Sequence, residues 1–177
     1  IQDFESIING GYVYVDKTAL VHQLVTEGKI YFLSRPRRFG KSLLVSTLKA
    51  YFKGKKELFK GLAIDALETE WAEYPVFHLD FNGDNFTKAG VLEEKIVGAI
   101  ETWEAEYGRD PYKQALGDRL IYVLAQAAKR YGRRAVVLID EYDNPLLDVL
   151  DTGFSTVVDG ERRLLEAHHR NMLKGLY

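Results

Sequence analysis

The feature that most constrains the fold is a short apolar run leading directly into a glycine-containing turn. Residues 30–34 read IYFLS and residues 35–42 read RPRRFGKS. A short run of apolar and aromatic residues is typical of a buried strand. After the turn, apolar residues recur at helical spacing, which predicts a helix from about Lys41 to Phe52 with Gly54 as its stop. The sequence therefore predicts a strand, a loop and a helix in immediate succession.

The loop ends in Gly40, Lys41 and Ser42, as a phosphate-binding loop does. The consensus G-x-x-x-x-G-K-[ST] fails at its first glycine, where this chain has Arg35, followed by Pro36. A helix N-terminus still offers amide donors and a positive dipole end to a phosphate. The residues expected to bind nucleotide are Arg37, Arg38, Phe39, Gly40, Lys41 and Ser42. Arg37 and Arg38 either contact phosphate oxygens or remain solvated or paired with acids, and the GKS tripeptide alone could arise by chance.

The rest of the chain alternates strand-like runs with helical stripes. We expect an extended segment at 12–15, a helix from Asp16 to Gly28, a strand at 74–81, a helix following the apolar stripe from Leu92 to Tyr107, a helix at about 112–131, a buried strand at 135–140 and a last helix from about Gly160. This alternation is typical of an α/β fold with a parallel sheet flanked by helices. No linker or repeat marks a boundary, so we expect one domain over residues 1–177.

A second candidate motif lies at residues 136–145, VVLIDEYDNP. Ligands of open parallel sheets bind at the carboxyl ends of strands, the edge that also carries the phosphate loop. We expect Asp140 and Ser42 to hold Mg²⁺, and Glu141 to polarise the attacking water while Lys41 contacts the β- and γ-phosphates. The alternative is an ordinary polar strand end. Asp143 is expected to stabilise the following turn, a structural role.

Composition narrows the functional classes. The chain has 24 Lys and Arg against 26 Asp and Glu, so a global basic field for nucleic acid or membrane is excluded. It has no cysteine, which excludes disulfides, thiolate zinc sites and a cysteine nucleophile. We expect no membrane span and a cytoplasmic location. The adjacent His168 and His169 are expected on a polar helix surface rather than at a metal, and His78 is expected to be packed or hydrogen-bonded.

Five phrases together resemble a known family. They are YVYVDKT (12–18), FLSRPRRFGKSLLVSTLKAYF (32–52), LFKGLAI (58–64), YPVFHLDF (74–81) and LIDEYDNP (138–145). The chain resembles the AAA-ATPase-like domain of bacterial proteins that often carry a PD-(D/E)XK nuclease-like domain. The resemblance implies a P-loop ATPase core with an additional-strand topology, in which Lys41, Ser42, Asp140 and Glu141 act as described above. It also places the segment from Tyr14 to Lys17 near the nucleotide base.

The resemblance also implies pieces that this chain lacks. Members of the group continue with a strand bearing a polar sensor residue, a lid and the nuclease-like part, whereas this chain stops at Tyr177. We therefore expect an incomplete P-loop sheet and the N-terminal part of a longer protein. The expected function is Mg²⁺-dependent ATP hydrolysis by the full-length protein, with weak turnover by the fragment.

Two other functions stay open. One is a non-catalytic module that senses nucleotide or binds a partner through a degenerate loop. The other is nucleic-acid binding by Arg35, Arg37 and Arg38, ranked last for this chain; in the parent protein, nucleic acid is expected to bind only through the missing C-terminal part. The expected ligands are ATP and Mg²⁺, and the sequence indicates no oligomeric state.

Overall fold

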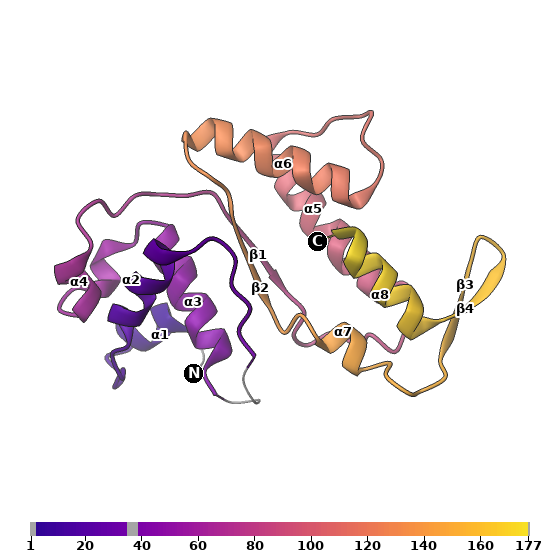
Figure 1. The fold of residues 1–177 in the computed structure, drawn as a ribbon, viewed down its shortest axis with the longest axis horizontal. Coiled ribbons are helices and arrows are strands. Elements are labelled where there is room, and N and C mark those ends of the chain that lie inside the picture. The colour runs from indigo at the N-terminus through magenta and orange to yellow at the C-terminus, as the bar shows by residue number, and fades with distance from the viewer. Residues whose placement is uncertain (1–2, 35–38, 177) are drawn as a thin grey trace. The chain divides into compact units, whose positions relative to one another are not determined.

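The computed structural model describes residues 3–34 and 39–176, which divide into two compact units (Figure 1). Unit 1 is Ile1–Val76 and unit 2 is Phe77–Tyr177. Unit 1 contains the helices α1 (Phe4–Asn9), α2 (Thr18–Glu27), α3 (Lys41–Phe52) and α4 (Ala63–Leu67), with the 3-10 helix η1 (Lys56–Phe59). Strand β1 (Val76–Asp80) begins at the boundary; unit 2 adds α5 (Val91–Tyr107), α6 (Leu116–Tyr131), β2 (Val136–Asp140), α7 (Asn144–Leu147), β3 (Ser155–Val158), β4 (Glu161–Leu164) and α8 (Leu165–Leu176).

Unit 1 is a small helical cluster around aromatic residues. Phe4, Phe59 and Ile64 are fully buried. The Phe59 ring centroid lies 4.8 Å from that of Phe4 and 5.1 Å from that of Trp71. Helix α1 packs on α3, and α2 packs on α4. This core supports the helix that follows the predicted phosphate loop.

The predicted helix after Asp16 is confirmed, and the structure shows what else this residue does. Oδ1 of Asp16 accepts hydrogen bonds from the Thr18 amide at 2.8 Å and its hydroxyl at 2.7 Å, while Oδ2 accepts from the Ala63 amide at 2.7 Å. The buried Thr18 hydroxyl oxygen also accepts from the Ile64 amide at 3.0 Å. The start of α2 therefore caps the start of α4, and Gly28 ends α2 as expected.

The prediction of a buried strand at residues 30–34 was wrong. None of these residues is in a strand, and the side chains of Ile30 and Phe32 are 94% and 70% exposed. A strand needs a neighbour for its amides and carbonyls. Within residues 3–34 and 39–75, the β pairing is an isolated bridge between Lys53 and Glu73. The apolar pattern was present, but the described residues supply no sheet for it.

Unit 2 is built on the strands predicted at 74–81 and 135–140. β1 and β2 form a two-stranded parallel sheet, and α5 and α6 lie between them in the chain. The pairing continues past β1, since the Phe81 amide donates to the Asp140 carbonyl at 3.1 Å. The buried side chains of Leu79, Phe81, Ile96 and Ile100 belong to one apolar cluster. The protein is thus α/β with a small parallel sheet.

The prediction that the strand at 135–140 is buried was wrong in part. Leu138 is buried, but Val137, one residue earlier, is 42% exposed. Neighbouring strand residues point to opposite faces, so one face of β2 is only partly covered. A continuous apolar run is typical of a strand that is covered on both faces. Around Val137, the described residues of unit 2 cover only one face of β2 fully.

Helices α5 and α6 are joined by a buried ion pair. Nε of Arg119 donates to Oε1 of Glu104 and Nη2 donates to Oε2, both at 2.8 Å. The two side chains are 8% and 6% exposed. Hydrogen bonds from Arg119 lower the pKa of Glu104 against the opposing effect of burial. The two buried charges therefore compensate one another in an ion pair that links α5 to α6.

The predicted helix from about Gly160 begins later, at Leu165, because a hairpin precedes it. β3 and β4 pair antiparallel with Val158 opposite Glu161. The two turn residues, Asp159 and Gly160, both have left-handed backbones, with φ 52° and 79°. Asp-Gly between two strands is a strong hairpin signal, and the sequence interpretation did not use it.

Candidate functional site

The second half of the predicted phosphate loop has the local geometry that the sequence implied. Gly40 has φ 76° and ψ 22°, and α3 begins at the next residue, Lys41, followed by Ser42. The first turn closes when the Leu44 amide donates to the Gly40 carbonyl at 3.0 Å. A side-chain cap of this N-terminus is absent among the described residues. A left-handed glycine followed directly by a helix start is the local geometry expected of an anion-binding loop.

Glycine at position 40 is required by its torsion rather than by space. A Cβ added there would meet nothing within 4 Å, but φ 76° is a conformation that L-residues rarely adopt. Phe39 is 63% exposed just before it. Arg35, Pro36, Arg37 and Arg38 lie outside the described residues, so the predicted contacts of Arg37 and Arg38 with phosphate stay predictions.

In unit 2, Asp140 ends strand β2 and is 6% exposed. Its Oδ1 accepts the Glu141 amide at 3.0 Å, and its carbonyl accepts the Phe81 amide. A buried carboxylate needs such partners or a cation to offset its lost hydration. A carboxylate at the carboxyl end of a parallel strand is also the arrangement expected of a magnesium ligand.

Glu141 adopts a strained backbone. Its φ is 50°, in the left-handed region that non-glycine residues seldom occupy. Its carbonyl accepts the Asn144 amide at 3.0 Å. Strain of this kind is found at functional positions and persists only where the surrounding structure holds it. Trp71, Asp151 and Asp159 also have positive φ among the described residues, and of these four Glu141 is the one that directly follows β2.

The turn after Glu141 is held by backbone groups. The Asp143 carbonyl accepts the amides of Leu146 and Leu147 at 3.0 and 2.9 Å, which begins α7. The Asp143 carboxylate makes no capping bond there, and its Oδ1 is buried without a partner in the described part of the chain. The predicted structural role of Asp143 is thus confirmed for its main chain and not for its side chain.

The prediction that His169 lies on a polar helix surface was wrong. Its side chain is buried, and its Nδ1 lies 2.8 Å from the carbonyl oxygen of Pro145. His168 is half-buried. The buried residues of α8 are Leu165, His169 and Leu173, spaced four apart. That spacing could have identified His169 as part of the apolar stripe.

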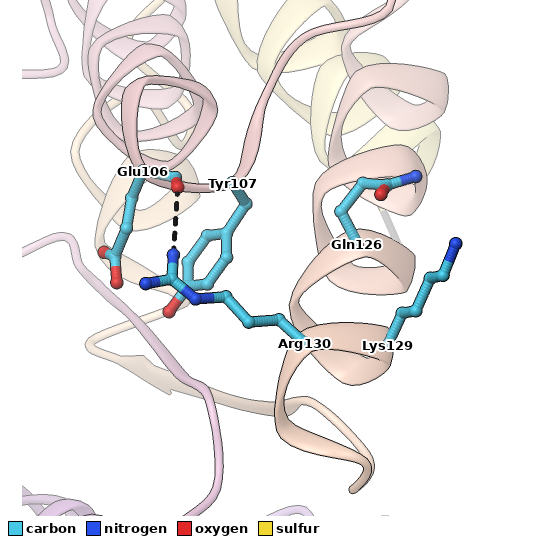
Figure 2. Close-up of a pocket in the computed structure, with 5 residues that line it drawn as sticks. All are labelled: Glu106, Tyr107, Gln126, Lys129 and Arg130. Carbon is cyan, nitrogen blue, oxygen red and sulfur yellow. Dashed lines mark hydrogen bonds between the residues drawn. The ribbon is translucent and has the colours of Figure 1, made fainter.

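A surface hollow of about 390 Å³ lies elsewhere in unit 2, between the ends of α5 and α6 (Figure 2). Glu106, Tyr107, Gln126, Lys129 and Arg130 line it. Arg130 donates to the Glu106 carbonyl at 3.4 Å and lies 5.9 Å from the centre of the Tyr107 ring. None of these residues was a predicted site residue, and the internal contacts account for the arginine.

The predicted magnesium ligands suit the ion in their chemistry. A hydroxyl in the first turn of α3 and a carboxylate at the end of β2 are both oxygen donors, which Mg²⁺ prefers beside phosphate and water. Ser42 belongs to unit 1 and Asp140 to unit 2, so their convergence stays a prediction. Across residues 3–34 and 39–176, no cluster of three or more His, Asp and Glu side chains forms an independent metal site.

Comparison with known proteins gives two matches. The family model described as "Predicted AAA-ATPase" matches residues 1–175. A curated protein of Azotobacter chroococcum mcd 1, named "Uncharacterized protein in vnfD 5'region", is 41% identical over 152 residues. The match covers 85% of this chain and 29% of the relative, so the chain spans less than a third of that protein's length. No solved structure matches. Among the described helices, none has the length and apolar character needed to cross a membrane.

Proposed function

The chain belongs to the AAA-ATPase-like family, and from that membership we propose that it is an ATP-binding P-loop module whose full-length protein hydrolyses ATP with Mg²⁺. The observation that most supports this proposal is the left-handed Gly40 directly before Lys41 and Ser42 at the start of α3. In this proposal β1 and β2 are two members of a larger P-loop sheet, within one domain spanning residues 1–177. The association with a nuclease-like region, nucleic-acid contact outside this chain and a cytoplasmic location stay predictions.

The phosphate half of the site uses groups of both backbone and side chain. Amides at the start of α3 bind the β-phosphate, and Lys41 neutralises charge on the β- and γ-phosphates. Arg37 and Arg38 add bidentate contacts to phosphate oxygens. The left-handed Gly40 supports this assignment because a left-handed residue beside helical ones is part of backbone turns that bind anions.

The acidic half supplies the chemistry of hydrolysis. Ser42 and Asp140 would hold Mg²⁺, which would offset negative charge on the phosphates of a bound nucleotide. Glu141 accepts a hydrogen bond from the water that attacks the γ-phosphorus and orients it for in-line displacement. The buried Asp140 and the strained Glu141, adjacent at the end of β2, support these separate roles.

Nucleotide binding is tested by titrating the chain with ATP, with Mg²⁺ and with EDTA. Lys41→Ala should weaken binding about 10- to 150-fold, the equivalent of a charged hydrogen bond of about 1.5–3 kcal/mol. Lys53→Ala is the control, because Lys53 caps the opposite end of α3. A folded chain that does not bind ATP at millimolar concentration would refute the proposal.

Hydrolysis is tested by phosphate release from a full-length protein that contains this chain. Glu141→Gln should leave ATP binding intact and lower turnover about 10²- to 10⁴-fold, the usual contribution of a general base. Asp143→Asn, two residues away, is the matched control and should retain turnover. Undiminished turnover in Glu141→Gln would show that the base is another group.

The alternative is a nucleotide-sensing or partner-binding module without catalysis. It is favoured by Arg35 and Pro36 at the place where the consensus has its first glycine. It predicts saturable ATP binding with no phosphate release by the full-length protein. The same two assays therefore separate the two functions.

A further inference from the structure

A buried histidine in α8 holds the turn that follows the acidic pair. His169 is 1% exposed, and its ring nitrogen Nδ1 lies 2.8 Å from the Pro145 carbonyl oxygen. A carbonyl can only accept, so Nδ1 carries the proton and donates it to this hydrogen bond. In the neutral ring Nε2 is then unprotonated, and it has no partner in the described part of unit 2. Burial lowers the pKa of His169, which favours this neutral form.

The acceptor belongs to a segment that cannot hold its own position. Helix α7 has four residues, too few to be stable without tertiary contacts. Its first residue, Asn144, donates its amide to the Glu141 carbonyl at 3.0 Å and accepts the Asp148 amide at 3.0 Å. A displacement of α7 is therefore passed to Glu141 through one hydrogen bond.

Beside the packing of Leu146 on the apolar cluster of unit 2, two hydrogen bonds of the described residues hold α7 from outside its own segment. His169 holds it from α8 through Pro145, and Asp148 holds it from the loop after β1 by accepting the Phe86 amide at 3.3 Å. The first contact is shorter and fully buried, since Pro145 and His169 are both buried. It is therefore the more constraining of the two.

The hydrogen bond to Pro145 distinguishes a histidine at position 169 from an apolar residue. His169 lies in the apolar stripe with Leu165 and Leu173, where a leucine would fill the space without leaving a buried nitrogen unpaired. An unpaired buried polar atom costs free energy. The hydrogen bond from Nδ1 to the Pro145 carbonyl offsets this cost, and a leucine could not make it.

We propose that His169 is a positioning residue for Glu141, acting through Pro145 and α7. This inference rests on the proposed role of Glu141 in orienting water. The left-handed backbone of Glu141 persists only while its surroundings hold it, and the His169 hydrogen bond is part of that support. Without it, α7 shifts, Glu141 relaxes and its carboxylate no longer meets the water.

The test compares two replacements of His169 in a full-length protein that contains this chain. Asparagine places an amide N–H near the position of Nδ1, whereas leucine keeps apolar volume and has no donor. His169→Leu should lower kcat about 10- to 100-fold, as small misplacements of catalytic groups do, with KM for ATP unchanged. His169→Asn should recover most of the loss. His168→Asn, the neighbouring control, should behave as the parent protein.

Amide hydrogen exchange provides a readout that does not depend on hydrolysis. His169→Leu should speed exchange at Asn144, Leu146 and Leu147 relative to His169→Asn, while exchange in α3 stays the same. If His169→Leu does not fold, His169→Gln replaces it, since its amide reaches the Nε2 position rather than Nδ1. Equal exchange and equal kcat in the donor and non-donor variants would overturn the proposal.

Glu141→Gln, measured alongside, separates this inference from the proposed function. If Glu141→Gln keeps full turnover, the assignment of the base fails, and His169 then has no catalytic group to position, whatever the exchange shows. If Glu141→Gln is inactive while His169→Leu keeps its kcat, the base is retained and the positioning role is overturned.

Discussion

The Glu141→Gly variant should be more stable than the Glu141→Ala variant, because residue 141 has a left-handed backbone with φ 50°. Both variants lose every contact of the carboxylate, so their difference isolates the Cβ. A left-handed conformation costs an L-residue about 1–2 kcal/mol. Glycine loses about 0.5–1 kcal/mol more backbone entropy than alanine on folding. With mid-range values of about 1.5 and about 0.75 kcal/mol for the two terms, the balance favours Glu141→Gly by about 0.75 kcal/mol.

Urea unfolding measures this difference. With an m value of about 1–3 kcal/mol/M, the midpoint of Glu141→Gly should exceed that of Glu141→Ala by about 0.2–1 M. Trp103 is a suitable fluorescent probe because it packs on Phe77 within unit 2, at 5.2 Å between ring centroids. A Trp71→Phe background removes the signal from unit 1.

The control is the same Ala-to-Gly comparison in a helix. Ala125 is exposed within α6, so Ala125→Gly should destabilise by about 1 kcal/mol. The two comparisons should therefore have opposite signs. If the Glu141→Gly variant is no more stable than Glu141→Ala, the backbone at residue 141 is not strained. The proposed role of Glu141 then loses its support from the backbone geometry. Glu141→Gly should also abolish ATP turnover, because it removes the carboxylate proposed to orient the attacking water.

Three further predictions concern buried polar groups. Thr18→Val should destabilise the chain by about 1–3 kcal/mol in thermal unfolding, because the Ile64 amide loses its acceptor, and the exposed Thr26→Val should change little. Arg119→Leu should lower the free energy of unfolding in urea by about 3–5 kcal/mol, and adding Glu104→Leu should restore part of it; a double variant less stable than the single one would contradict this. The folded-state pKa of Glu104 is lowered, so its stabilisation is present above the ordinary glutamate value of about 4.5 and is lost as pH falls through the lower folded value. Unfolding of Glu104→Gln between pH 3 and 6 should accordingly depend less on pH.

Much of the candidate site could be predicted because its signals are local. A glycine before Lys41 favours a left-handed turn whatever surrounds it, and the helix start follows directly. An apolar run ending at Asp140 predicts a strand with an acid at its carboxyl end, and the structure has that strand. Asp159 and Gly160 carried an equally local hairpin signal, which was overlooked.

The order of residues along the chain determined much of its local geometry, such as the start of α3 after Gly40 and the end of β2 at Asp140. Tertiary structure alone decided whether residues 30–34 had strand neighbours and whether His169 faced water or Pro145. Torsional preference is a property of a few adjacent residues, so sequence encodes it directly. Burial and strand pairing depend on groups far apart in the chain, and the same apolar pattern serves a sheet, a core or an exposed segment according to what lies beside it.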